Sequence, residues 1–194
     1  MRSSYAKNNY EAIFENVIKI FLPHKCVELG VLDGYSTLHI AKGAMEAFVK
    51  SNHPMHLNAY DLWEDYPYKH GSMADVEYML QRHKVNELVT LHKRDAFTVH
   101  DDYAKNSVCF LHVDLSNDGE VLRKIVERWD DKLSFGGMMM FEGGSVERDN
   151  VDWMIKYGKE SIRDEINTNI TLNKKYLFAT HYPFPSLSVF IKHS

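Results

Sequence analysis

The sequence predicts a single α/β domain built on a mostly parallel seven-stranded sheet, with helices on both faces and an antiparallel hairpin at the C-terminus. Five strand-sized apolar segments alternate with helix-sized segments, an order typical of parallel strands joined by right-handed crossovers. Two further strand segments close the chain with a short proline-containing loop between them, which indicates a hairpin. The 194 residues, without repeats or low-complexity stretches, fit one domain with a substantial core.

Residues 8–22 open the order of elements with apolar side chains at helical spacing, and Pro23 ends this helix before the first strand. We expect residues 1–24 to form an N-terminal helical cap on a domain that covers residues 1–194. The expected strands cover residues 26–29, 56–60, 89–92, 108–113, 138–141, 176–180 and 188–192. The expected later helices cover residues 36–50, 72–83, 96–103, 118–131 and 150–166.

The composition, 44% apolar and 26% charged residues, is that of an ordinary globular protein. The net charge is −4 and Lys and Arg form no stripe, which argues against a nucleic-acid partner. No segment approaches the ~20 apolar residues of a membrane span, and the first residues lack an apolar signal region. Cys26 and Cys109 fall in expected buried strands, which favours reduced thiols. We expect a cytoplasmic protein with a small-molecule substrate and no membrane partner, and leave open a homo-oligomer.

A glycine-containing segment, Glu28–Thr37, directly follows the first strand and opens a helix, where open α/β sheets bind ligands. Gly30 and Gly34 let the backbone turn tightly and approach a ligand, while Ser36 or Thr37 can cap the helix and donate to a carboxylate. The spacing is Gly-x-x-x-Gly rather than the Gly-x-Gly-x-x-Gly that wraps a pyrophosphate, so NAD and FAD are disfavoured. The alternative is a purely structural turn with a helix cap.

Two segments resemble class I S-adenosylmethionine-dependent methyltransferases. Residues 28–36, Glu-Leu-Gly-Val-Leu-Asp-Gly-Tyr-Ser, are similar to the first motif of catechol O-methyltransferases. Residues 60–67, Tyr-Asp-Leu-Trp-Glu-Asp-Tyr-Pro, resemble the Phe-Asp-Ser-Phe-Glu-Gly-Leu-Pro segment of macrocin-type O-methyltransferases. The resemblance implies S-adenosylmethionine as cofactor and a Rossmann-like methyltransferase fold. The cofactor-binding residues that it implies are Glu28, Gly30, Gly34, Tyr35, Ser36, Asp61, Asp95 and Asp114.

The resemblance also implies individual contacts within that set. Asp61 is expected to bind the ribose hydroxyls, because a carboxylate at the end of the neighbouring strand can accept both hydroxyl hydrogens; the alternative is a solvated loop residue. Asp95, in Lys-Arg-Asp-Ala at the end of the third strand, corresponds to the acid that faces the adenine, or else is a helix N-cap. The fourth strand and the Gly-Gly entry to the fifth extend the likeness over residues 26–144.

Asp114 and Glu142 are the expected catalytic residues, at the ends of the fourth and fifth strands. They fall on metal-ligand positions of the metal-dependent O-methyltransferases, which implies Mg²⁺ as a second cofactor that lowers the pKa of a substrate hydroxyl. The sequence departs from that pattern, because Gly143 replaces the third ligand, Ser116 a further acid and Asn117 the lysine base. The alternative is that both acids bind substrate, or the methionine ammonium, without a metal.

Other polar residues near these strand ends have weaker patterns. Asp118 suits a helix N-cap better than a metal ligand or base, and His112 on a central strand suits a packed core. His181 and Arg148 are candidate substrate contacts, although the loop of residues 142–149 also fits a solvated connection. The aromatic loop of residues 63–73 could close over an aromatic or sugar-like substrate, or pack against the adenine.

Together these patterns predict methyl transfer to a small molecule, and the resemblance implies a hydroxyl oxygen as the acceptor. Residues 114–117, Asp-Leu-Ser-Asn, lack the Asn/Asp-Pro-Pro-aromatic segment of amino-methylating nucleic-acid enzymes. Two alternatives stay open: a nucleotide-dependent or NAD-dependent enzyme on a similar sheet, and a non-catalytic protein that binds S-adenosylmethionine or a nucleotide.

Overall fold

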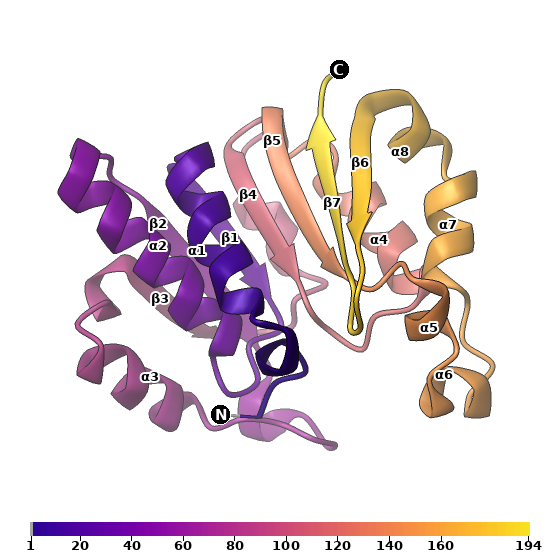
Figure 1. The fold of residues 1–194 in the computed structure, drawn as a ribbon, viewed down its shortest axis with the longest axis horizontal. Helices are drawn as coiled ribbons and strands as arrows, with labels where there is room; N and C mark the ends of the chain where they lie inside the picture. Colours follow the sequence, from indigo (N-terminus) through magenta and orange to yellow (C-terminus); the bar gives the residue numbers. More distant parts are fainter. Residues whose placement is uncertain (1) are drawn as a thin grey trace. The chain divides into compact units, whose positions relative to one another are not determined.

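A computed structural model describes residues 2–194 of the chain, and these form two compact units (Figure 1). The first unit ends at Val99, and the second comprises His100–Ser194. Within the described residues no helix is long and apolar enough to cross a membrane. Whether the chain behaves as one domain, as the sequence predicts, stays a prediction.

The first unit carries three parallel strands in the order β3-β2-β1. The strands are β1 (Lys25–Leu29), β2 (His56–Asp61) and β3 (Val89–Lys93). The helices are α1 (Tyr10–Phe21), α2 (Tyr35–Ser51) and α3 (Met73–Arg82), with short 3-10 turns η1 (Tyr5–Asn8), η2 (Trp63–Asp65) and η3 (Asn86–Leu88). The parallel register brings the carboxyl ends of the three strands to one edge, which positions the loops that follow them.

Helices α1 and α2 lie side by side (Figure 1). Tyr10, Phe14 and Ile18 follow the four-residue spacing of one helix face and are buried. A glycine, Gly43 of α2, permits the close approach, because a Cβ there would lie 2.7 Å from the carbonyl oxygen of Glu15. The expected first helix is confirmed, since α1 ends at Phe21, two residues before Pro23.

The second unit carries four strands in the order β4-β5-β7-β6 (Figure 1). Strand β4 (Val108–Val113) is parallel to β5 (Leu133–Glu142), while β7 (Leu187–Lys192) is antiparallel to both β5 and β6 (Tyr176–His181). The helical elements are η4 (Val99–Asp102), α4 (Gly119–Trp129), α5 (Val146–Asp149), α6 (Asp152–Lys156), α7 (Ile162–Thr168) and α8 (Ile170–Lys175).

The predicted fold class, a mostly parallel seven-stranded sheet with a C-terminal antiparallel hairpin, is confirmed. Strand β5 begins five residues earlier than expected, at Leu133. Gly136 adopts a φ of +74°, and the register with β4 shifts between Val108 and Phe110. This irregularity lets β5 include the Gly136-Gly137 pair, whereas the sequence pattern predicts a strand that starts after that pair.

One expected helix is wrong, and a second is shorter than expected. Residues 150–166 were expected to form one helix, but Gly158 at a φ of +55° breaks it, and Ser161 caps a new helix by accepting from the amide of Asp164. The short helix expected over residues 96–103 is the 3-10 helix η4, which covers only Val99–Asp102. In residues 150–166 the glycine conformation and the serine cap override the helical spacing of the apolar residues.

Candidate functional site

The glycine turn, residues 30–34, joins β1 to α2 in the first unit. Gly30 and Gly34 have φ values of +88° and +77°, conformations that side-chain-bearing residues rarely adopt. The amide of Gly30 donates to the carbonyl oxygen of Tyr60 at 2.9 Å, and that of Gly34 donates to the carbonyl oxygen of Val31 at 2.9 Å. Backbone hydrogen bonds therefore fix the turn internally and also connect it to the end of β2.

Asp61, at the end of β2, holds the glycine turn through its side chain. Its Oδ2 atom accepts from the amides of Val31 and Leu32 at 2.8 and 3.0 Å, and Oδ1 accepts from the amide of Trp63 at 2.9 Å. Asp61 is thus not a solvated loop residue. An ionised carboxylate has about four lone-pair directions, so three amides leave about one for a ligand hydroxyl. The ribose contact stays a prediction.

Glu28 is fully buried on β1 and is bound by two hydroxyls of α2. The hydroxyls of Ser36 and Thr37 donate to its Oε1 and Oε2 atoms, each at 2.5 Å. The expectation that either residue caps α2 is wrong, because Gly34 is the N-cap and makes no side-chain bond. A buried carboxylate is stable only when hydrogen-bond donors offset its loss of water, and the two hydroxyls point inward to supply these hydrogen bonds.

Tyr35 and Asp95, two further expected cofactor contacts, have protein partners. The Tyr35 hydroxyl donates to the Glu11 carboxylate of α1, and burial together with this bond raises the pKa of Tyr35. Asp95 Oδ1 accepts from the amide of Phe97 at 2.9 Å, which forms a local turn after β3. No α-helix begins at Asp95, so the N-cap alternative is wrong, and its contact with adenine stays a prediction.

The aromatic loop after β2 splits into a buried and an exposed part. Trp63 is fully buried and its Nε1 atom donates to the carbonyl oxygen of His92 at 3.2 Å, so Trp63 is a packing residue. Tyr66 and Tyr68 contact each other edge to face, with ring centroids 5.4 Å apart, and Tyr68 is largely exposed. A contact of this loop with a substrate or with the adenine stays a prediction.

Gly71 and Arg2 hold this loop against the glycine turn, an arrangement that the sequence pattern does not reveal. A Cβ on Gly71 would lie 1.7 Å from the carbonyl oxygen of Leu32. Arg2 Nη2 donates to Asp33 Oδ1 at 2.7 Å and to the carbonyl oxygen of His70 at 2.9 Å. The Arg2 guanidinium lowers the pKa of Asp33 to about 2. The loop and the turn are thus one packed structure.

We expect Gly71→Ala to weaken cofactor binding at least tenfold although Gly71 needs no cofactor contact of its own. The added Cβ must displace the backbone at Leu32, and overpacking of this kind costs about 1–3 kcal/mol of stability. Calorimetric titration with S-adenosylmethionine and urea unfolding measure the two effects. Lys69→Ala, at an exposed position in the same loop, is the matched control. Unchanged affinity in Gly71→Ala would contradict the coupling of loop and turn.

The second unit places Glu142, at the end of β5, in a buried ion pair with Arg148 of α5. Arg148 Nε donates to Glu142 Oε1 at 2.5 Å, and Nη2 donates to Oε2 at 2.8 Å. Glu142 is 4% exposed and Arg148 5% exposed. Ser145 caps α5 by accepting from the Arg148 amide at 3.1 Å, and the guanidinium lies 5.2 Å from the Trp153 ring. The expectation of a solvated connection over residues 142–149 is therefore wrong.

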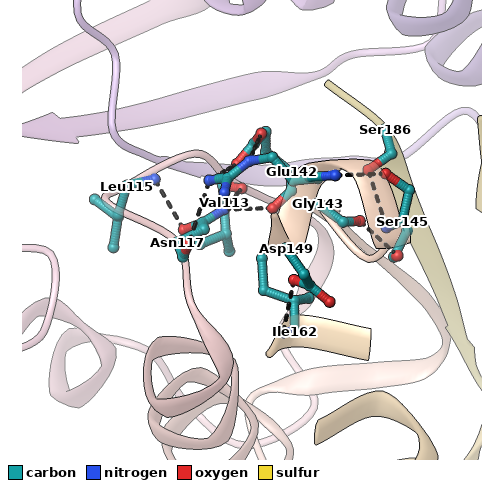
Figure 2. A network of polar contacts seen from close by, with 11 residues as sticks. Val113, Leu115, Asn117, Glu142, Gly143, Ser145, Asp149, Ile162 and Ser186 are labelled. Atoms are coloured by element: carbon teal, nitrogen blue, oxygen red, sulfur yellow. Dashed lines mark hydrogen bonds and ion pairs between the residues drawn. The ribbon is translucent and has the colours of Figure 1, made fainter. Parts of the chain in front are cut away.

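Asn117 joins the ends of β4 and β5 (Figure 2). Its Nδ2 atom donates to the carbonyl oxygens of Val113 and Glu142 at 3.1 and 2.9 Å, and its Oδ1 atom accepts from the amide of Leu115 at 3.1 Å. A buried amide with three bonds stabilises the loop after β4. Asn117, at the position where the resemblance places a lysine base, is structural.

Three other polar residues of this region have defined surroundings. Asp118 accepts from the amide of Val121 at 2.8 Å and caps α4, which confirms the cap interpretation. His112 is fully buried on β4, as expected of a core histidine. His181 is exposed at the end of β6, and its contact with substrate stays a prediction.

The residues present do not fit the Mg²⁺ site that the resemblance implies. Both carboxylate oxygens of Glu142 are bound by Arg148. A Cβ at Gly143 would lie 2.4 Å from Ile162 Cδ1, and the φ of Gly143 is +115°, so a ligand side chain here would displace Ile162 and strain the backbone. Among residues 2–194 no three His, Cys, Asp or Glu side chains are grouped to hold a metal ion. Burial and the nearby Asp114 carboxylate raise the pKa of Glu142, and the bonds from Arg148 oppose that rise.

Solved structures share this arrangement of strands over nearly the whole chain. The SAH-bound methyltransferase PaMTH1 of Podospora anserina is 13% identical, with a TM-score of 0.74 over 100% of this chain and 80% of that one. The O-methyltransferase TomG of Streptomyces achromogenes is 11% identical, with a TM-score of 0.68 over 95% and 79%. A putative rRNA-methylase of Clostridium thermocellum is 16% identical, with a TM-score of 0.65 over 100% and 98%. The chain therefore has the α/β fold of the methyltransferases.

A family model described as a methyltransferase domain matches residues 27–142. The match covers more than half of the chain and spans β1 to the end of β5, which includes the glycine turn, Asp61 and Glu142. The chain belongs to this methyltransferase family. No curated protein sequence matched the chain.

Proposed function

We propose that the protein transfers a methyl group from S-adenosylmethionine to a hydroxyl oxygen of a small molecule. The observation that carries this proposal is the glycine turn bound by the Asp61 carboxylate, in a chain of the methyltransferase family. TomG, which shares the fold, is an O-methyltransferase solved with SAM, and PaMTH1 is solved with SAH. The acceptor oxygen and the small-molecule substrate are parts of the proposal.

The residues of the first unit suit the cofactor. The glycine turn offers a backbone without side chains at Gly30 and Gly34, which suits close approach of the methionine part. Asp61 keeps acceptor capacity for a ribose hydroxyl, and we assign the adenine contact to Asp95, two residues after the end of β3. When bound, S-adenosylmethionine supplies a methyl group already activated by the sulfonium charge.

The chain's own task is to hold the acceptor hydroxyl in line with that methyl group, exclude water and remove one proton. We assign proton removal to Asp114, the carboxylate that follows β4. Glu142 is held by Arg148 and Asn117 and supports the shape of the site. Transfer would form a bond between the hydroxyl oxygen and the methyl carbon and break the methyl–sulfur bond, so that S-adenosylhomocysteine leaves. The hydroxyl proton would pass to Asp114, without a metal.

A cytoplasmic location is part of this proposal. Cys26 and Cys109 form no disulfide within residues 2–194, and Cys26 is buried. Thiols that stay reduced are typical of proteins in reducing compartments.

The test is methyl transfer from isotope-labelled S-adenosylmethionine, followed by mass spectrometry. One arm offers a panel of hydroxylated small molecules and the other offers ribosomal RNA, because one protein of this fold is a putative rRNA-methylase. We expect label in an O-methylated small molecule and none in RNA. Label in RNA alone, or on nitrogen alone, would contradict the proposal.

A further inference from the structure

Three charged groups meet where β4 and β5 end in the second unit: the carboxylates of Asp114 and Glu142, and the guanidinium of Arg148. Glu142 and Arg148 are almost completely buried and form a two-bonded pair. Asp114 is near enough to act electrostatically on both partners. Two carboxylates in a poorly solvated place repel each other, so such a cluster needs a cation.

Arg148 meets that need with a fixed geometry. Its Nη2 atom also donates to the carbonyl oxygen of Asn117 at 3.2 Å, and its guanidinium lies over the Trp153 ring. The Ser145 cap fixes the backbone that carries it. The charge is therefore held by contacts from the loop after β4, from α5 and from α6.

A divalent cation would compete with this guanidinium for the same oxygens. Mg²⁺ binds carboxylate oxygens directly, and both oxygens of Glu142 already accept charge-assisted hydrogen bonds. A metal ion would also place two positive charges beside the guanidinium. The ion pair and a bound metal thus exclude each other.

The guanidinium keeps one donor group unused. Its Nη1 atom is buried and has no hydrogen-bond acceptor among residues 2–194. A buried donor without an acceptor is unfavourable, and a structural ion pair normally has all its donors satisfied. An oxygen atom of a bound substrate would satisfy this donor, in the same way that a substrate oxygen can complete the coordination of a metal ion.

We propose that the guanidinium of Arg148 takes the place of a divalent cation at the carboxylates that follow β4 and β5, so that this site works without a metal. That the site is catalytic rests on the proposed function, but the exclusion of the metal is a property of the folded chain. Arg148 is a positioning residue, which acts through Glu142 and through the charge balance around Asp114.

The test measures Mn²⁺ uptake by electron paramagnetic resonance, with S-adenosylhomocysteine present. We expect the wild-type protein and Arg148→Lys, which keeps the positive charge, to bind no Mn²⁺. Arg148→Ala leaves two carboxylates without their cation, and we expect it to bind Mn²⁺ and to melt at a higher temperature when Mn²⁺ is added. The double variant Arg148→Ala with Glu142→Gln should lose this uptake and this shift. Methyl transfer by the wild type should be the same in EDTA as in Mg²⁺.

Stoichiometric Mn²⁺ uptake by the wild type, or loss of its transfer in EDTA, would overturn the proposal. A folded Arg148→Ala variant that gains no Mn²⁺ would overturn it too. If that variant does not fold, uptake by the wild type and by Arg148→Lys decides. A wild type that transfers no methyl group at all would count against the proposed function alone, because the uptake measurement needs no turnover.

Discussion

Asp114→Ala is expected to lower kcat for methyl transfer by a factor of about 10²–10⁴, the usual contribution of a general base. Asp114 follows β4 directly, and we assign it the proton of the acceptor hydroxyl. Affinity for S-adenosylmethionine should change only modestly, because we assign the cofactor contacts mainly to the glycine turn and Asp61. Steady-state kinetics with the acceptor found by mass spectrometry, together with calorimetric titration of the cofactor, measure the two effects.

Two variants control this experiment. Asp114→Asn keeps the size of the side chain and removes its charge and basicity, so it should lose nearly as much kcat as Asp114→Ala. Asp101→Ala removes an exposed carboxylate of η4 and should leave kcat unchanged. An Asp114→Asn variant with wild-type kcat would show that Asp114 is not the base.

Asp61→Ala should weaken the binding of S-adenosylmethionine at least tenfold, about 1.4 kcal/mol. The change removes the acceptor of three amides, two of them in the glycine turn, together with the expected ribose contact. Gly30→Val should have an effect at least as large, since a β-branched residue strongly resists the φ of +88° at this position. Calorimetric titration gives the affinities.

The matched control is Asp65→Ala, at an exposed carboxylate that pairs with Lys93 at 2.8 Å. An exposed ion pair contributes about 0–1 kcal/mol, so cofactor affinity should stay at the wild-type value. Urea unfolding of each variant separates loss of the fold from loss of the site. Wild-type affinity in both Asp61→Ala and Gly30→Val would count heavily against the assignment of the cofactor site.

The strands could be predicted from the sequence because each is a short apolar segment bounded by glycine, proline or charged residues. The Val108–Val113 strand has the expected bounds, and β1, β2 and β3 differ from expectation by one residue at one end. The region between β5 and β6 could not be predicted equally well. Its apolar spacing suits one helix, but Gly158 and the Ser161 cap divide it, and Asp149 accepts from the Ser161 hydroxyl and the Ile162 amide.

The same limit applies to the candidate site: its short motifs could be predicted from the sequence, but the contacts between distant residues could not. The glycine turn and Asp61 could be located because short motifs carry them. The partner of each polar group could not, because Glu28 reaches across to α2 and Gly71 meets Leu32 from 39 positions along the chain. The Arg148 ion pair depends on the helix cap at Ser145 and joins Arg148 to Glu142, six positions earlier in the chain. Sequence spacing alone does not distinguish this arrangement from a solvated loop.

Calorimetric titration of the wild-type protein with S-adenosylmethionine and, separately, with NAD⁺ tests most directly whether the turn after β1 and the acid that ends β2 form an adenosyl pocket. We predict saturable binding of one S-adenosylmethionine per chain and no heat of binding from NAD⁺. Binding of NAD⁺ in preference to S-adenosylmethionine, or no binding of S-adenosylmethionine by folded protein, would contradict the account.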